Sequence, residues 1–242
     1  MYYGEVIQDG LLDMVSSGTV ASASATSLAL SGDGLRRLFG NVERHAESFV
    51  LRPTDISNSP TIINRLGVVA VNSALEVDVY SHVNSTHLGG TRLINGVGGS
   101  GDFTRNSPCA IITLPSTAAD GDISRVVPMV SHVDHTEHDV AVIVIEQGVA
   151  DLRGKSPCER AETIVECCAH PEFRPRLRGY LSSAARAGGH LRHDLDEAFS
   201  FHKTTAEPRV LVPHKTLRLL LPRRESDGEV DTEQLLKTAV RN

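Results

Sequence analysis

The sequence of 242 residues contains no tryptophan, no long apolar run and no basic segment with interleaved aromatic residues. No stretch approaches the roughly 18 uninterrupted apolar residues of a membrane-spanning helix, and the N-terminus lacks the basic and apolar regions of a signal peptide. A net charge of −6 disfavours nucleic acid as a partner. We therefore expect a soluble protein that binds neither nucleic acid nor membranes and is cytoplasmic, or mitochondrial in a eukaryotic source.

Cysteine is scarce, and its spacing indicates no structural metal site. The four cysteines are an adjacent pair, Cys167 and Cys168, and two single residues, Cys109 and Cys158. Because no CxxC motif occurs, neither a zinc ribbon nor a disulfide framework is indicated, and we expect reduced thiols. With 40% hydrophobic residues the chain can bury a substantial core, as one large domain or two small ones.

Glycine, in contrast, is concentrated in the stretch from Ile94 to Phe103, where Gly96, Gly98, Gly99 and Gly101 fall within six positions. Glycine loses more backbone freedom on ordering than any other residue, so such a run is a poor helix or strand. It can instead adopt positive φ and present consecutive N–H groups to negative charge. A flexible surface turn is the alternative, but the flanking apolar segments favour an anion cradle.

The hydrophobic pattern predicts an open α/β fold in which a mixed or largely parallel sheet is flanked by helices. Helices are expected at residues 6–17, 33–39 (with Asp33 as the cap), 60–66, 156–169, 173–187 and 194–201. Strands are expected within residues 19–31 and at 49–52, 67–80, 110–114, 124–130 and 140–145. The segment after residue 203 is expected to be an extension or a partly disordered tail.

Glu146 directly follows the most emphatic strand, Val140 to Ile145. Ligand sites of open α/β folds lie at the carboxyl ends of strands, which makes Glu146 a candidate together with the glycine-rich loop. A partly desolvated Glu146 would have a raised pKa suited to proton or acyl chemistry, and the alternative is a solvated loop acid. Glu5, at the start of the first predicted helix, is explained equally well by the helix dipole.

Two motif-like strings are better explained without a cofactor. Gly96-x-Gly98-x-x-Gly101 matches the dinucleotide fingerprint, but Pro108 and a strand follow where a full helix is required. The segment Ser131 to Asp139 is rich in histidine and acids, yet it lacks an HExxH motif or a clean i, i+4 helical context. We interpret this segment as a polar loop that hydrogen-bonds the neighbouring active-site turn, and expect no bound metal.

Several ordered strings nevertheless resemble the acetyl-CoA hydrolase/transferase family, in particular its succinyl-CoA:acetate CoA-transferase branch. They are YGEVIQDG from Tyr3, Ser57-Asn58, VNSALEVD from Val71, NSTH from Asn84, NGVGGSGDF from Asn95, HVDHTEHD from His132 and EQGVADLRG from Glu146. The resemblance covers about residues 1 to 202. It implies a CoA-transferase domain of the NagB/RpiA-like fold, a class I CoA-transferase or acetyl-CoA hydrolase active in acetate and acetyl-CoA metabolism.

The resemblance also implies roles for individual residues. Glu5 corresponds to the nucleophile that forms an acyl-glutamyl anhydride and then a glutamyl-CoA thioester. Gly99 corresponds to an oxyanion donor, of a kind worth about 3 kcal/mol of barrier. Asn58 matches an amide that orients the substrate carboxylate or the glutamate, and Glu146 matches a second active-site acid. The residues Gly96, Gly98, Gly99, Ser100 and Gly101 are expected to let the CoA arm pass close to the backbone.

Coenzyme A thioester is then a substrate, and no bound cofactor is expected. The other substrates would be small carboxylates such as acetate and succinate, with water replacing them in a hydrolase. Family members are much longer than this chain and bind substrate between two α/β domains. Residues 1–203 are therefore expected to be a C-terminal CoA-transferase domain that is N-terminally truncated, and 204–242 a tail. Activity would then require a missing N-terminal half, and a homodimer is a further expectation.

Overall fold

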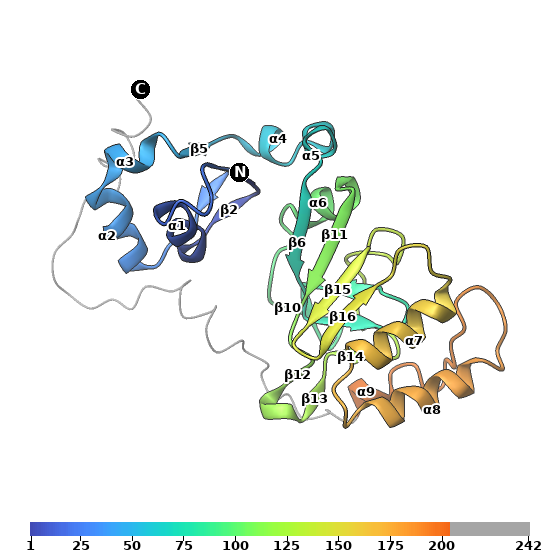
Figure 1. The fold of residues 1–242 in the computed structure, drawn as a ribbon. Helices are drawn as coiled ribbons and strands as arrows, with labels where there is room; N and C mark the ends of the chain where they lie inside the picture. The colour runs from blue at the N-terminus through green and yellow to red at the C-terminus, as the bar shows by residue number, and fades with distance from the viewer. Residues whose placement is uncertain (204–242) are drawn as a thin grey trace. The chain divides into compact units, whose positions relative to one another are not determined.

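A computed structural model describes residues 1–203 (Figure 1). Its helices are α1 (Asp9–Ser16), α2 (Gly32–Gly40), α3 (Val42–Ala46), α4 (Thr54–Ser57), α5 (Pro60–Leu66), α6 (Ser100–Asn106), α7 (Pro157–Cys167), α8 (Arg174–Ala184), α9 (Ser200–Lys203) and the 3-10 turn η1 (Ala119–Gly121). Within residues 1–203 no helix is long and apolar enough to cross a bilayer. The predicted tail lies outside the described residues.

The largest sheet has the strand order β16-β15-β11-β6. Its strands are β6 (Val69–Ser73), β11 (Cys109–Thr113), β15 (Val142–Ile145) and β16 (Gly148–Asp151). β6, β11 and β15 are mutually parallel, whereas β16 returns antiparallel to β15 through the two-residue turn Glu146-Gln147. These strands are rich in β-branched residues, as buried parallel strands usually are. The predicted α/β architecture with a mixed sheet is therefore confirmed.

Two three-stranded sheets accompany it, in the orders β1-β3-β5 and β14-β7-β8. Their strands are β1 (Tyr2–Tyr3), β3 (Ala23–Ala25), β5 (Phe49–Leu51), β7 (Glu76–Asp78), β8 (Val83–Asn84) and β14 (Val126–Val127). The remaining strands form two-stranded pairs: β2 (Val6–Ile7) with β4 (Ser27–Leu28), β9 (His87–Leu88) with β10 (Arg92–Leu93), and β12 (Thr117–Ala118) with β13 (Ile123–Ser124). The small residues of β3 pack tightly between β1 and β5, as a run of Ala and Ser permits.

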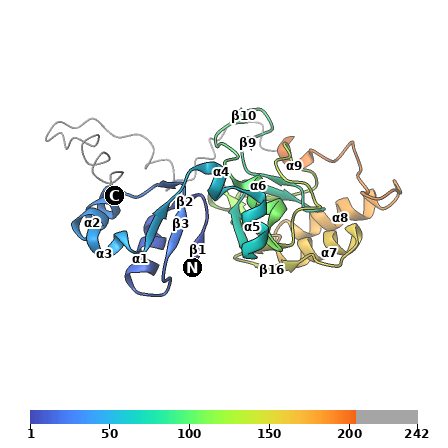
Figure 2. The same ribbon diagram turned by 90° about the horizontal axis from the view of Figure 1, so that it is seen from above.

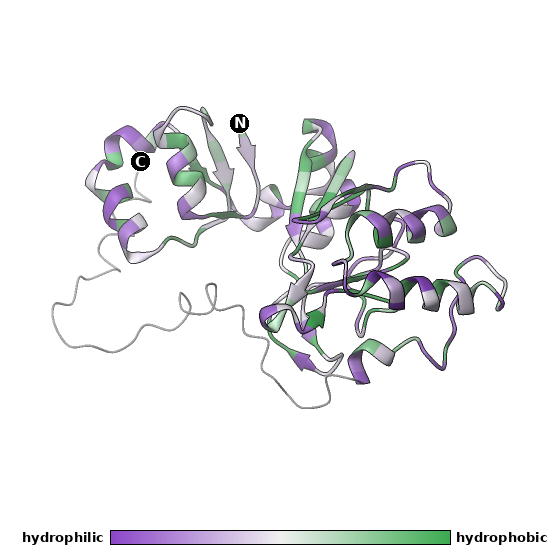
Figure 3. Ribbon diagram, turned by 60° about the horizontal axis from the view of Figure 1, so that its bottom comes forward, coloured by the Kyte–Doolittle hydropathy of each residue, from purple (hydrophilic) through white to green (hydrophobic). Residues whose placement is uncertain are grey.

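The four-stranded sheet is covered on one face and open on the other. Side chains of directly paired residues share a face, so Ala70, Ile112, Ile143 and Ala150 belong together, and each is at most 3% exposed. α6 contacts β6 and β11, and α7 contacts β16. In Figure 2 α5 is seen beside α6, which it contacts. Figure 3 shows polar and apolar residues alternating along the helices, as expected for helices with one face on a sheet.

The opposite face carries Val69, Val71 and Val149, which are 57%, 63% and 56% exposed. We call this side of the sheet the open face. Because β6 pairs only with β11, its outer side also has no strand neighbour among residues 1–203, and we call it the free edge.

Several predicted helices are confirmed by the structure. α5 spans the predicted residues 60–66, and α8 lies within the predicted 173–187. α7 begins with the predicted capping box, in which the Ser156 hydroxyl accepts from the Glu159 N–H and the Glu159 carboxylate accepts from the Ser156 N–H.

Other expected elements are wrong. Residues Val6 and Ile7 form β2 rather than helix, and α1 starts only at Asp9. Ser31, not Asp33, caps α2, because its hydroxyl accepts from the Gly34 N–H at 3.0 Å. The expected helix 194–201 is mostly turn, and only α9 forms. The expected strand 124–130 is divided between β13 and β14, and the helix α6 was not expected.

Candidate active site

Glu5 lies in the two-residue break between β1 and β2, not at a helix N-terminus. Its carbonyl oxygen accepts from the N–H groups of Thr26 and Ser27 at 2.9 and 3.1 Å. β1 and β2 continue on either side, each paired in parallel with its own partner strand. The backbone of Glu5 is thus fixed by strands on both sides, which leaves the side chain free to point away from both ladders.

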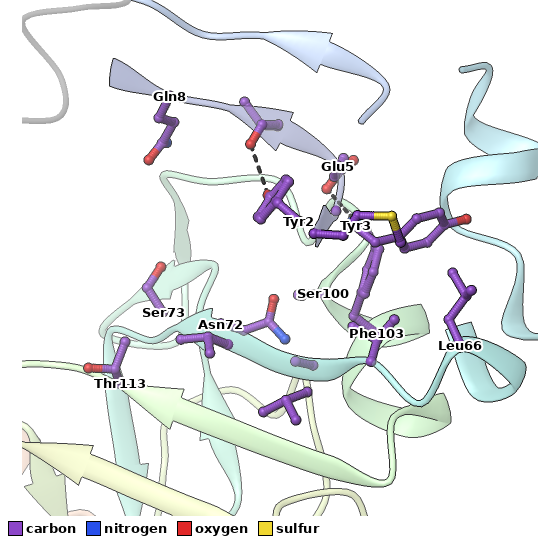
Figure 4. A pocket seen from close by; sticks show the side chains of 18 of the residues that line it. Tyr2, Tyr3, Glu5, Gln8, Leu66, Asn72, Ser73, Ser100, Phe103 and Thr113 are labelled. Atoms are coloured by element: carbon purple, nitrogen blue, oxygen red, sulfur yellow. Dashed lines mark hydrogen bonds between the residues drawn. The ribbon is translucent and has the colours of Figure 1, made fainter. Parts of the chain in front are cut away.

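The Glu5 carboxylate meets the glycine-rich loop. The Gly99 N–H donates to Glu5 Oε2 at 2.7 Å (Figure 4). Gly98 has a φ of 54°, and a Cβ at this position would lie 2.9 Å from Glu5 Oε2. Gly98 therefore meets two requirements that favour glycine, a left-handed backbone and close approach of the carboxylate.

Asn58, at the C-terminal end of α4, completes this group. It is 8% exposed, and a Cβ on Gly99 would lie 2.3 Å from its Nδ2 atom. Asn58 Oδ1 is buried and accepts no hydrogen bond within the part of the chain that the structure describes. α4 is held near β1 because the Tyr3 hydroxyl donates to the Ile56 carbonyl at 2.6 Å. The structure therefore brings together Glu5, Gly98, Gly99 and Asn58.

A cavity of about 850 Å³ opens beside Glu5. It is bounded by β1 and the start of β2 on one side and by β6 on the other, with Gly99 and Ser100 at its margin. In Figure 4 the Tyr3 and Phe103 side chains lie next to each other, and their ring centroids are 6.2 Å apart. Of the other loop glycines, Gly96 is exposed and Gly101 is in α6, where a Cβ would meet nothing within 4 Å.

Glu146 belongs to a different set of contacts. It is exposed in the turn between β15 and β16, where its carboxylate accepts from the Ser116 N–H at 2.9 Å and from the Ser116 hydroxyl. Burial acts to raise the pKa of Glu146, but these hydrogen bonds outweigh it and hold the pKa below its usual value. The expectation of a raised pKa was wrong, because Ser116 stabilises the ionised form.

Replacing Ser116 by alanine is therefore expected to raise the pKa of Glu146. The substitution removes the hydroxyl donor but keeps the backbone N–H donor, so the pKa rises part of the way towards its ordinary value. A carboxyl-carbon NMR titration of the variant would measure the change. Ser182→Ala is the matched control, since the Ser182 hydroxyl donates within α8 to the Arg178 carbonyl. An unchanged Glu146 titration in Ser116→Ala would contradict the assigned cause.

The segment Ser131 to Asp139 forms the predicted polar loop. His135 is 3% exposed, and its Nε2 lies 3.2 Å from the Ser100 Oγ, which itself donates to the Val97 carbonyl at 2.7 Å. The expected hydrogen bond to the glycine-rich turn is therefore present. Burial lowers the pKa of His135, which favours a neutral ring at physiological pH.

His82 is held between two carboxylates, with Nδ1 3.0 Å from Asp78 Oδ2 and Nε2 2.9 Å from Glu137 Oε2. Burial disfavours the imidazolium, but these carboxylates outweigh it and raise the pKa of His82. The stabilisation is then fully present below the unfolded pKa of about 6.5 and is lost as pH rises through the higher folded pKa.

We accordingly expect His82→Gln to lower the free energy of unfolding by about 2 kcal/mol at pH 5.5 and by less at high pH. Urea denaturation of both proteins across this pH range would measure the difference. Replacing His190, which is exposed in the loop after α8, by Gln is the matched control. A penalty for His82→Gln that does not change with pH would contradict the charged pair.

Some residues that matter in this region were not predicted from the sequence. Tyr3 and Phe103 link β1 to α6, and the hydrogen bonds from Ser116 lower the pKa of Glu146. Tyr3 lies two positions before Glu5 in the chain and could have been suspected on that ground. For Ser116 no local signal existed, because its partner is thirty positions away in the sequence.

Comparison with known proteins finds relatives that are named as CoA transferases or acetyl-CoA hydrolases. The chain is 52% identical over 203 residues to propanoyl-CoA:succinate CoA transferase of Escherichia coli, covering 84% of this chain and 41% of the relative. It is 51% identical over 201 residues to succinyl-CoA:acetate CoA-transferase of Clostridium kluyveri, covering 83% and 37%. It is 46% identical over 212 residues to acetyl-CoA hydrolase of Saccharomyces cerevisiae, covering 84% and 40%. The chain thus spans about two fifths of the length of these relatives.

Solved structures agree on the fold. RipA from Yersinia pestis matches with a TM-score of 0.66 and 31% identity over 75% of this chain and 43% of that one. The 4-hydroxybutyrate CoA-transferase from Porphyromonas gingivalis matches with a TM-score of 0.58 and 27% identity over 75% and 45%. The model of the acetyl-CoA hydrolase/transferase C-terminal domain matches residues 34–181. This chain therefore belongs to the acetyl-CoA hydrolase/transferase family, whose C-terminal domain it contains.

Proposed function

We propose that this chain carries the covalent half-site of a CoA-transferase, with acyl-CoA hydrolysis as a side or main activity. The observation that carries the proposal is the 2.7 Å hydrogen bond from the Gly99 N–H to the Glu5 carboxylate, with Asn58 buried beside it. A fixed carboxylate in contact with a main-chain donor is the arrangement that covalent acyl chemistry needs. The relatives named as CoA transferases and hydrolases support the same chemistry.

In the proposed first step a Glu5 oxygen attacks the thioester carbonyl carbon of an acyl-CoA. The C–S bond breaks, giving an acyl-glutamyl anhydride and CoA thiolate. The thiolate then attacks the Glu5 carbonyl carbon and expels the donor carboxylate, leaving a glutamyl-CoA thioester. An acceptor carboxylate attacks this thioester, the C–S bond breaks, and CoA thiolate leaves as a new anhydride forms. The thiolate finally attacks the acyl carbon of this anhydride, which gives the new acyl-CoA and restores the Glu5 carboxylate.

Gly99 has a specific part in these steps. Because its N–H already donates to Glu5 Oε2, it stays bonded to this oxygen when attack at the Glu5 carbon turns it into an oxyanion. Asn58 is proposed to orient the carboxylate that enters or leaves, by donating from its Nδ2 amide group. Glu146 is proposed as a second active-site carboxylate. It remains ionised and interacts with the substrate rather than with Glu5.

A second candidate is that the chain binds CoA weakly and acts only with a partner polypeptide. One observation favours it, since no Lys or Arg among residues 1–203 lines the cavity beside Glu5, where such a side chain could pair with the CoA phosphates. Calorimetry with CoA separates the candidates. Measurable affinity that is reduced by Ser100→Leu, at a residue that lines the cavity, would support a half-site that holds CoA alone, and no heat would support the second candidate.

The chemistry itself is tested by trapping. The full chain is incubated with succinyl-CoA, treated with hydroxylamine and digested, and the peptide containing Glu5 is analysed by mass spectrometry. A hydroxamate on Glu5 is the expected result, because hydroxylamine cleaves both the anhydride and the thioester. An adduct on any other carboxylate would overturn the assignment of the nucleophile.

A further inference from the structure

The cavity beside Glu5 is bordered by the unpaired sides of two strands. β1 pairs only with β3, and β6 pairs only with β11 among the described residues. All of β1 and all of β6 line this cavity. The unpaired side of β1 and the unpaired side of β6 therefore face the same cavity.

The hydrogen bonds of each strand show to which side its backbone N–H and C=O groups point. The Ala74 N–H, at the end of β6, donates to the Thr113 carbonyl at 3.1 Å. Backbone groups point alternately to the two sides of a strand, so Ala70 and Asn72 also face β11, whereas Val69, Val71 and Ser73 face the free edge. In β1 the Tyr2 and Gly4 N–H groups donate to the Ser22 and Ser24 carbonyls at 2.8 and 3.0 Å, so by the same alternation the Tyr3 N–H points to the opposite side, towards the cavity.

The cavity lies beside β6 rather than over one of its faces. Five consecutive residues, Val69 to Ser73, line it although their side chains alternate between the two faces. A strand residue rises about 3.3 Å, so an added strand of five residues would run along the same length of the cavity wall as Val69 to Ser73.

The lining also restricts the chemistry of the occupant. Among residues 1–203, Glu5 is its one charged side chain and no Lys or Arg lines it, so the phosphates of a nucleotide would lie there unpaired. Val69, Val71 and Leu66 are 57%, 63% and 48% exposed at its wall. Along β6, β-branched side chains without charge lie next to main-chain groups that have no strand partner in this part of the chain, which suits an extended apolar peptide.

We propose that the free edge of β6 accepts an extended, uncharged, apolar segment of a second polypeptide as an added β-strand. The relatives offer such a source, because about three fifths of the E. coli propanoyl-CoA:succinate CoA transferase lies outside the match to this chain. The binding uses main-chain hydrogen bonds from Val69, Val71 and Ser73, none of which has a part in the chemistry proposed for Glu5.

The test uses the full chain and short overlapping synthetic peptides that cover the unmatched part of this E. coli relative. Amide hydrogen exchange, resolved by residue with NMR, is followed with each peptide. At least one peptide is expected to slow exchange at Val69, Val71 and Ser73 about tenfold when present at ten times its dissociation constant. The amides of Ala70 and Asn72, already bonded to β11, should not change, so the expected pattern alternates along β6.

Val71→Pro supplies the matched variant. It removes an N–H that points away from β11, where proline is tolerated on an edge strand, so the chain still folds while the added strand loses a donor. Val71→Thr keeps the N–H and should keep the protection. No alternating protection with any peptide overturns the proposal. So does protection by CoA alone, which would assign the cavity to substrate, or protection that grows with the concentration of the chain alone, which would indicate a second copy.

Discussion

Glu5→Gln is expected to lower the rate of adduct formation from succinyl-CoA by about 10⁴-fold or more. The amide is nearly isosteric, and its oxygen can still accept from the Gly99 N–H, so the local structure is retained. A neutral amide, however, does not attack a thioester, and removal of a nucleophile typically costs catalysis on this scale. Single-turnover mass spectrometry with succinyl-CoA measures the rate directly.

The control for this variant is Asp33→Asn. Asp33 is an exposed carboxylate in α2 that pairs with Arg36 and Arg37 on the surface. Its loss should leave the labelling rate unchanged, and thermal unfolding should show that both variants fold. Labelling of Glu5→Gln at the rate of the unaltered chain would reject Glu5 as the nucleophile.

Gly99→Ala is expected to lower the same rate about 10²- to 10³-fold. The Gly99 backbone, with φ of −81° and ψ of 2°, is one that alanine adopts without strain. The cost comes instead from the added Cβ, which would lie 2.3 Å from Asn58 Nδ2 and 3.1 Å from Glu5 Oε2. Asn58 is buried, so relieving the contact displaces the amide, the carboxylate or the N–H that joins them.

A double variant separates packing from chemistry. Asn58→Ala in the Gly99→Ala background removes the clashing amide, so the free energy of unfolding should recover while the rate stays low. Gly10→Ala is the matched single control, because a Cβ on this α1 residue would meet nothing within 4 Å. Full activity in Gly99→Ala would show that this loop tolerates displacement and has no part in the chemistry.

The elements predicted correctly are those whose signal is local. α5 follows from Pro60 at its first position, α7 from the capping box of Ser156 and Glu159, and β15 from an unbroken run of β-branched residues. Each signal involves residues within a few positions of one another, so the sequence alone suffices.

The errors arose where a tertiary contact overrides a local pattern. Val6 and Ile7 fit a helical period, but pairing with β4 makes them a strand. Ser31 caps α2 instead of Asp33, because the helix already begins at Gly32 and Asp33 lies inside its first turn. Glu146 follows a buried strand as predicted, yet Ser116 from a distant loop determines its pKa.

The residues of the candidate site also divide into those with a local sequence signal and those that only tertiary contacts bring into place. The glycine-rich loop was identifiable from composition, whereas nothing in the residues alone placed Glu5 and Asn58 beside it. Their roles came from the resemblance to a family, and the 2.7 Å contact between Gly99 and Glu5 joins segments 94 positions apart. Such a contact depends on how β1 and the loop pack, which no local pattern encodes.

The open face of the four-stranded sheet has a consequence for handling the protein. Val69, Val71 and Val149 present β-branched side chains to water on one surface, and the adjoining edge of β6 has no strand partner among residues 1–203. Exposed strands of this kind template intermolecular pairing, and neither β6 nor β16 contains a lysine or a proline that would oppose it. Colloidal stability of the isolated chain is therefore limited by this surface, and a lysine at Val71 should raise the concentration at which it precipitates.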